Sequence, residues 1–219
     1  NFMDVLILKK LDEKFKYLDL TKNISHKGKC LYEEVYQSSR TQDGAISAYL
    51  LGEDIIPPNK DPNPITKENG YAGGYLFCPK TGIYNFLFDE DLTSLYPSII
   101  MSLNISPETK VGSVTNWNNK SFVDGEMDKF SVETDGTVDL NREQFDSFMT
   151  EHNLTISSNG ILYRQDKRGI IPEVLEQWFN QRIEFQKLMK KHGAEFFLSG
   201  KQHDKEMADF YDRRQHIQK

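Results

Sequence analysis

The sequence predicts an α+β protein. Apolar residues recur at three- and four-residue spacing near the N-terminus and again in the last third, which is typical of helices. Between these regions the apolar spacing changes from two to three or four near Asp91, as at a strand-to-helix junction. A stretch rich in Pro and Gly at residues 55–74 separates the first helical region from this junction. The 219 residues would suffice for one domain or two small ones.

The first fifty residues are expected to form two helices. Residues 4–20 carry an apolar stripe that predicts one amphipathic helix: Val5, Leu8, Leu11, Phe15 and Leu18. A second helix is predicted over residues 31–51. Residues 55–74 then contain four of the eight prolines and three glycines, so we expect a linker or an extended loop.

The middle of the chain is expected to hold strands followed by a short helix. Residues 75–78 and 84–91 are predicted as strands, separated by a turn at residues 79–82. A helix should follow, with Ser94 as its N-cap, Pro97 in its first turn and Asn104 at its end. Residues 113–160 are polar and give only weak indications.

The last third is expected to be two helices. A long helix is predicted from Pro172 to about Lys191, with Gly193 just past its end. A final helix is predicted over residues 203–219, with no stop signal where the sequence ends, as if the chain were cut there.

The composition excludes several classes of protein. Hydrophobic residues make up 37%, but 14 Phe and 10 Tyr can supply a core, so a fully disordered chain is not expected. No apolar run reaches the length of a membrane span, and the N-terminus lacks the features of a signal peptide. Cys30 and Cys78 lack CxxC spacing, which favours a reduced, cytoplasmic chain.

The charge is unevenly distributed along the chain. The net charge of −6 alone argues against a nucleic-acid partner. Residues 160–219, however, hold 12 Lys and Arg against 9 Asp and Glu, a balance of +3 that leaves −9 for the rest. This pattern fits either an ordinary solvated helix surface or an enzyme that grips a polyanion through metal ions.

Asp91 is the strongest candidate for chemistry. A carboxylate at the end of a strand is held rigidly, and Mg²⁺ is usually bound by one or two such groups together with phosphate oxygens. The backbone N–H groups at the following helix start could receive phosphate oxygens, and Tyr96 could form the floor of a sugar pocket. Alternatively, Asp91 is a solubilising residue and Tyr96 packs in a core.

Four motifs resemble a known family, and they occur along the chain in the order that the family has. The sequence DLTSLYPSII, followed by NISPET, is similar to motif A of the B-family DNA polymerases, and especially to replicative polymerases of T-even-like bacteriophages. The other matches are the YAGG sequence at Tyr71–Gly74, the GIIP and FNQR sequences at Gly169–Pro172 and Phe179–Arg182, and the opening of motif B at Asp212–Lys219.

The resemblance implies roles for the residues of motif A. In this family two Mg²⁺ ions drive attack of a primer 3′-hydroxyl on the α-phosphate of a dNTP. Asp91 and the carbonyl of Leu92 would face a metal ion, and Ser94 and Leu95 would offer backbone N–H groups to the triphosphate. Tyr96 would lie under the deoxyribose and exclude a 2′-hydroxyl. Asp89 matches no family carboxylate.

The resemblance also implies a triphosphate site on the last two helices. Arg182 and Lys219 match cations that bind the triphosphate, and Gln215 lies on the same helix face as Lys219. Family members often carry a Lys four residues after this Arg, whereas position 186 is Gln here.

Two further roles follow from the resemblance. Tyr71, Gly73 and Gly74 would contact template DNA. Asp4 matches the Asp of the family's third exonuclease motif and would bind a metal ion there. Alternatively, Asp4 is a helix N-terminal Asp favoured by the helix dipole.

The implied fold is a multi-domain α+β fragment. Residues 1–54 would be the helical C-terminal end of a ribonuclease-H-like 3′–5′ exonuclease domain, and residues 55–82 a linker. Residues 83–168 would be a partial palm sheet with helices and a variable insertion, and residues 169–219 antiparallel helical fingers.

Motif C, the second palm carboxylate motif, and a thumb are absent from the sequence, so we expect a piece of a polymerase that is inactive alone. The implied partners are primer–template DNA, dNTP, the remainder of the polymerase and a sliding clamp. Two alternatives are a non-catalytic DNA-binding or scaffolding piece, and a protein-primed polymerase of the same family, against which NISPET and FNQR speak.

Overall fold

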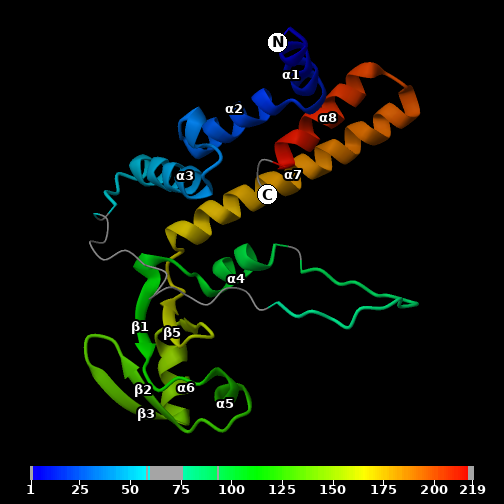
Figure 1. Ribbon diagram of the computed structural model, residues 1–219. Helices are drawn as coiled ribbons and strands as arrows, with labels where there is room; N and C mark the ends of the chain where they lie inside the picture. Colours follow the sequence, from blue (N-terminus) through cyan, green and yellow to red (C-terminus); the bar gives the residue numbers. More distant parts are fainter. Residues whose placement is uncertain (1, 58, 60–75, 93, 217–219) are drawn as a thin grey trace.

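The computed structural model describes residues 2–57, 59, 76–92 and 94–216. A group of helices forms one part of the molecule and an antiparallel sheet with two small helices forms the other (Figure 1). The mixed α+β class predicted from the sequence is therefore confirmed. Within the described residues, no helix is both long and apolar enough to cross a membrane.

The N-terminal helical region is two helices, α1 (Phe2–Phe15) and α2 (Tyr17–Gly28), and the prediction of one helix over residues 4–20 is wrong. The break lies at Lys16, which has a left-handed φ of 55°. Its amide still donates to the carbonyl of Asp12 at 2.7 Å, and the Asp12 carboxylate accepts from the amide of Leu18 at 2.9 Å. No Gly or Pro marks this break, and the apolar spacing continues across it. The sequence therefore gives no sign that the helix ends at this point.

The predicted helix over residues 31–51 is also divided. A 3-10 turn, η1 (Tyr32–Glu34), is followed by α3 (Ser38–Gly52), which packs on α2. The two helices approach closely through glycines: a Cβ on Gly44 would lie 2.2 Å from the carbonyl oxygen of Gly28. The packing of α2 on α3 therefore depends on glycine at position 44.

Residues 76–92, here called the arm, protrude from the body beside α4, the helix of Leu95–Leu103 (Figure 1). The strands predicted at residues 75–78 and 84–91 are wrong for the part that is described, because the arm has no regular secondary structure. A strand needs a partner for its backbone groups, and no described segment pairs with the arm. Its apolar side chains are also uncovered, with Ile83 98% and Phe86 102% exposed.

The sheet part comprises residues 110–164; its residue patterns alone did not predict these strands, and only the family resemblance implied a sheet within residues 83–168. Its five antiparallel strands lie in the order β3-β2-β1-β5-β4, with α6 packed on the sheet. The bounds are β1 (Lys110–Val114), α5 (Asn119–Val123), β2 (Lys129–Glu133), β3 (Thr137–Asn141), α6 (Arg142–Glu151), β4 (Leu154–Ile156) and β5 (Ile161–Arg164).

The core of the sheet part is small and aromatic. Phe130 on β2 and Phe145 on α6 are fully buried, and their rings stack at a centroid distance of 4.1 Å. The other buried members are Val114, Met127, Val132 and Leu162. Strands of three to five residues give only one or two alternations each, so the period-two pattern is too short to be recognised in a polar sequence.

The last third is an antiparallel hairpin of two helices, α7 (Ile170–Ser199) and α8 (Gln202–His216), as predicted. The predicted end of the first helix is wrong, because α7 continues through Gly193 and ends at Gly200, which has a left-handed φ of 64°. Nothing described lies within 4 Å of a Cβ added at Gly193, so no close approach requires glycine there.

Candidate functional site

The motif A segment joins the end of the arm to helix α4 (Leu95–Leu103). Ser94 occupies the N-cap position and Pro97 lies in the first turn, as predicted. Ser94 has a left-handed φ of 55°, and among the described residues its hydroxyl makes no capping hydrogen bond. The entry to α4 therefore leaves backbone N–H groups of its first turn without helical partners.

Asp91, Leu92 and Tyr96 all lie on the surface. Tyr96 is 75% exposed and Leu92 69% exposed, so neither belongs to a core formed by the described residues. Within that part of the chain, no hydrogen bond or ion pair engages the Asp91 carboxylate. Carboxylate and carbonyl oxygens are the ligands that Mg²⁺ prefers. The Asp91 carboxylate and the Leu92 carbonyl thus offer the type of oxygen ligand that Mg²⁺ takes.

The end of α4 is fixed by a buried asparagine. Asn104 is 2% exposed and has a left-handed φ of 56°. Its side-chain amide donates to the carbonyls of Arg164 at 2.7 Å and Lys167 at 2.8 Å, and its side-chain oxygen accepts from the amide of Gly169 at 2.8 Å. One side chain therefore joins the end of α4 to the chain segment that enters α7.

Ser106 and Glu108 extend this connection to the first amides of α7. The Glu108 carboxylate accepts from the amide of Ile170 at 2.6 Å, and the Ser106 hydroxyl accepts from the amide of Ile171 at 3.3 Å. The Ser106 hydroxyl in turn donates to Glu108 at 2.8 Å. A carboxylate at a helix N-terminus is favoured by unpaired amides and by the helix dipole. We call residues 104–109 the clamp; the name refers to this segment of the chain and not to a sliding clamp protein.

The carbonyls at the C-terminal end of α4 are satisfied by side chains from elsewhere. Arg168 donates to the carbonyl of Met101 at 2.7 Å and pairs with Glu176 of α7 at 2.7 Å. Thr155 of β4 donates to the carbonyl of Leu103 at 2.9 Å. Helix α4 is thereby held against α7 and the sheet, so the clamp and Arg168 together set the direction of α7 relative to motif A.

The clamp is what the sequence reasoning missed. In the sequence alone, residues 104–109 stand out only as a match to a family motif, and Asn104 only as the end of a helix. A signal was present, since Ser106 and Glu108 are small-polar and acidic residues typical of caps. They cap a helix that begins more than sixty residues later, however, and no local pattern identifies such a partner.

Two of the predicted triphosphate residues, Arg182 and Gln215, lie on α7 and α8. Gln186 of α7 donates to the side-chain oxygen of Gln215 on α8 at 3.3 Å, and Gln215 donates to Asp212 at 3.2 Å. Arg182 lies one turn before Gln186, and its Nε is buried without a hydrogen-bond partner in the described structure. The Gln found at position 186 therefore positions Gln215.

Lys27 of α2 is a cation that the sequence reasoning did not select. Its ammonium donates to the side-chain oxygen of Gln181 at 2.6 Å and lies 5.4 Å from the ring centroid of Trp178. The pKa of Lys27 is lowered, first by burial and second by the positive charge of Arg214. This residue brings α2 against the FNQR sequence of α7, a contact across 154 positions that no sequence pattern reveals.

The structure brings together only some of the predicted site residues. No described hydrogen bond or ion pair joins Asp91 to Arg182 or Gln215. Asp4 lies in the first turn of α1, which agrees with both of its interpretations. The other predicted positions, Lys219 and the DNA-contacting Tyr71, Gly73 and Gly74, fall outside the described residues.

In a comparison with known proteins, the chain is similar to DNA polymerases of bacteriophages and of a virus. The chain is 27% identical over 184 residues to the DNA-directed DNA polymerase of Escherichia phage RB69, covering 84% of this chain and 18% of the relative. It is 29% identical over 189 residues to the DNA-directed DNA polymerase of Enterobacteria phage T4, covering 86% of this chain and 18% of that protein. The DNA polymerase of Fowlpox virus is 28% identical over 158 residues, 71% of this chain and 15% of the relative.

The particular family follows from a match over most of the chain. The family model for DNA polymerase family B matches residues 35–219. The chain belongs to DNA polymerase family B, and the resemblance to polymerases of T-even-like phages is confirmed. It spans about a fifth of the length of these phage relatives.

Proposed function

We propose that this chain supplies the motif A carboxylate and the fingers of a DNA polymerase that adds dNTPs to a primer 3′-hydroxyl under template direction. The main support is the placement of the motif A carboxylate, Asp91, at the entry to α4, which the clamp joins to α7 and its FNQR sequence. The family match extends over both elements.

The motif A residues would bind the metal and the nucleotide. When bound, Mg²⁺ would supply charge neutralisation for the transferring phosphoryl group. Asp91 and the Leu92 carbonyl would hold this ion through oxygen atoms. The amides of Ser94 and Leu95, at the entry to α4, would orient triphosphate oxygens. Tyr96, exposed beside them, would lie under the deoxyribose and exclude a 2′-hydroxyl.

The fingers residues would bind the triphosphate from the other side. Arg182 would supply a positive charge, and its buried Nε is available for a hydrogen bond. Lys219 would add a second cation, and Gln215 would be held in place by Gln186 and Asp212. With Gln at position 186, we propose that the triphosphate is bound without a third fingers cation from that position.

The proposed domain limits follow the sequence motifs. Residues 1–54 would be the C-terminal end of the exonuclease domain, with Asp4 as its metal ligand, and residues 55–82 a linker with the DNA-contacting Tyr71, Gly73 and Gly74. Residues 83–168 would be part of the palm, and residues 169–219 the fingers. The proposed partners are primer–template DNA, dNTP, the remaining polymerase and a sliding clamp.

We propose that the isolated chain does not polymerise, because no second palm carboxylate motif of the family occurs in its sequence. The test is primer extension with the 219-residue chain alone and with a second chain that carries motif C and the thumb. We expect incorporation only in the mixture, and loss of about a hundredfold or more with Asp91→Ala, as for other groups that stabilise transition-state charge.

Asp89→Ala is the matched control, because Asp89 is an acidic residue of the same segment that matches no family carboxylate; its activity should stay near that of the unchanged chain. Mg²⁺-dependent incorporation by the isolated chain would disprove the proposed inactivity. Restored activity that survives Asp91→Ala would instead favour a non-catalytic scaffolding role.

A further inference from the structure

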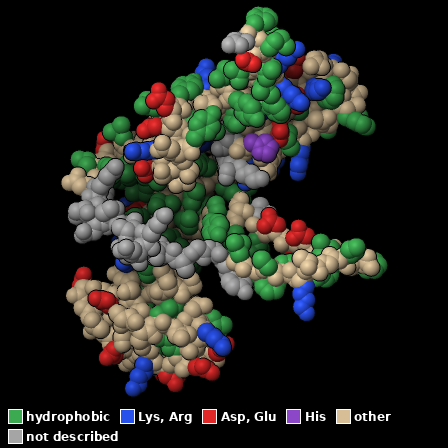
Figure 2. Space-filling model, viewed as in Figure 1, with side chains coloured by type: hydrophobic (Ala, Val, Ile, Leu, Met, Phe, Trp, Pro, Cys, Tyr) green, Lys and Arg blue, Asp and Glu red, His purple; other side chains and the backbone are tan. Residues whose placement is uncertain are grey.

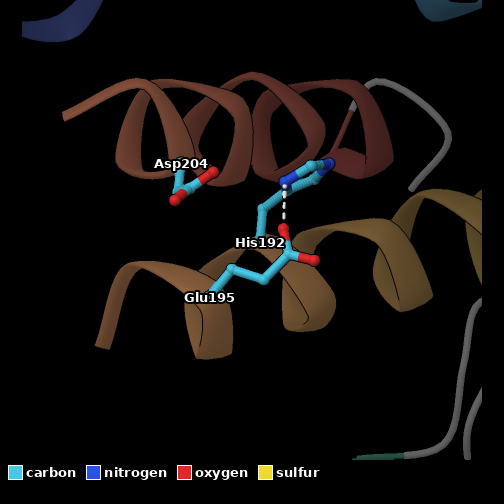
Figure 3. Close-up of side chains that lie close together, drawn as sticks. All are labelled: His192, Glu195 and Asp204. Carbon is cyan, nitrogen blue, oxygen red and sulfur yellow. Dashed lines mark ion pairs between the residues drawn. The ribbon is translucent and has the colours of Figure 1, made fainter. Parts of the chain in front are cut away.

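Three potential metal ligands meet at the end of the α7–α8 hairpin. His192 and Glu195 come from the last turns of α7, and Asp204 comes from the first turn of α8. Their side chains point into the space between the two helices (Figure 3). One ligand atom from each residue lies within 4.8 Å of the other two. All three residues are partly buried; the His192 side chain is 20% exposed and the Glu195 side chain 44%.

His192 is held in place by an aromatic contact. Its ring stacks on Tyr211 of α8, with a centroid distance of 5.6 Å and an angle of 11° between the planes. The Nδ1 atom is buried and lies 3.0 Å from a carboxylate oxygen of Glu195, but the contact does not have the geometry of a hydrogen bond. In the described structure, this buried imidazole nitrogen thus forms an ion pair with Glu195 inside the cluster when the ring is protonated, and it makes no hydrogen bond (Figure 3).

Asp204 is oriented by a residue outside the cluster. The Ser199 hydroxyl donates to one carboxylate oxygen of Asp204 at 2.9 Å and accepts from the amide of Lys201 at 3.2 Å. Ser199, the last residue of α7, therefore holds the Asp204 carboxylate from the end of that helix. Hydrogen bonds of this kind, made to a ligand from behind, are a regular feature of metal sites.

We propose that His192, Glu195 and Asp204 bind a transition-metal cation, with Zn²⁺ as the expected ion. One imidazole nitrogen and two carboxylate oxygens suit Zn²⁺, which accepts mixed nitrogen and oxygen ligands. Mg²⁺ prefers oxygen ligands alone, so this site differs in chemistry from the oxygen ligands at Asp91. The bound ion would link α7 to α8 across the turn at Gly200.

The test is calorimetric titration of the metal-free 219-residue chain with Zn²⁺, together with the unfolding temperature in the presence and absence of Zn²⁺. We expect one saturable site per chain and a higher unfolding temperature with Zn²⁺. His192→Ala and Asp204→Asn should each weaken binding at least tenfold and remove the rise in unfolding temperature. Mg²⁺ at the same concentration should not compete.

His203→Ala is the matched control, because His203 is an exposed histidine next to Asp204 that does not belong to the cluster. Zinc affinity should be unchanged in this variant. Circular dichroism will show whether His192→Ala retains its helices, and Glu195→Gln serves as a second ligand variant if it does not. Absence of saturable binding, or equal affinity in the ligand variants and the unchanged chain, would overturn the proposal.

Discussion

The sheet part and the arm both contain phenylalanines, but those of the sheet part are buried and those of the arm are exposed. Phe130 and Phe145 of the sheet part are 0% and 1% exposed, whereas Phe86 and Phe88 of the arm are 102% and 82% exposed. The space-filling view shows hydrophobic side chains along the protruding arm (Figure 2). The arm carries Asp91, the proposed metal-binding carboxylate, and the sheet part carries none of the predicted site residues.

The residues that stabilise the fold and the residue proposed to carry the chemistry therefore lie in different regions. The sheet part buries its own aromatic residues and pairs its own strands, so its fold is explained by its own contacts. The arm finds no cover among the described residues, and Asp91, the carboxylate proposed to bind a metal ion, lies where the arm approaches α4. The clamp lies between the two regions and connects them to α7.

The largest expected effect is in the core of the sheet part. Phe130→Ala should lower the free energy of unfolding by about 3–5 kcal/mol, because it removes a buried ring stacked on Phe145 and leaves a cavity. Urea unfolding of the 219-residue chain measures this change. Phe88→Ala in the arm is the matched control and should change stability by less than about 0.5 kcal/mol. Equal losses in both variants would contradict the comparison.

A somewhat smaller effect is expected in the clamp. Asn104→Gly keeps the left-handed backbone conformation but removes three hydrogen bonds from a buried position, which should cost about 2–3 kcal/mol. Urea unfolding again gives the change. Asn153→Gly is the control, since Asn153 also has a left-handed φ but is exposed, and its substitution should be nearly neutral. A neutral Asn104→Gly would show that the clamp does not hold α4 to α7.

The smallest effect concerns an exposed ion pair at the end of β5. Hydrogen bonding to Arg164 lowers the pKa of Asp166 from its usual 3.8 to about 2. Because the pKa is depressed in the folded state, the pair stabilises the fold above pH 3.8 and this contribution is lost as the pH falls through about 2. The carboxyl titration of Asp166, followed by NMR, should move back toward the usual value in Arg164→Gln. An unchanged midpoint would exclude the pairing.

Sequence patterns predicted the elements that contain their own periodicity and end signals. The helix from Ser94 to Asn104 and the two-helix hairpin after Gly169 were recognised in this way. The motif around Asp91 indicated both the chemistry and the family, because several residue types are required there together.

The remaining features depend on contacts between distant residues. The break at Lys16 is stabilised by Asp12 without a Gly or Pro, and α7 passes through Gly193 because Gly200 supplies the left-handed end. The clamp pairs Glu108 with an amide at position 170, and Lys27 reaches Gln181 from a helix far away in sequence. Such pairs become visible only when the chain is folded.

The clamp has a mechanical consequence, because it lies at one end of a long rigid element. With 30 residues, α7 extends for about 45 Å at a rise of about 1.5 Å per residue. A rotation of about 5° at the clamp would therefore displace the far end of α7 by roughly 4 Å, given that length. Such a rotation would be centred on the hydrogen bonds of Asn104 and Glu108, at the N-terminal end of α7. A shift of a few tenths of an ångström in the backbone beside motif A would then move the far end of the hairpin about tenfold or more as far.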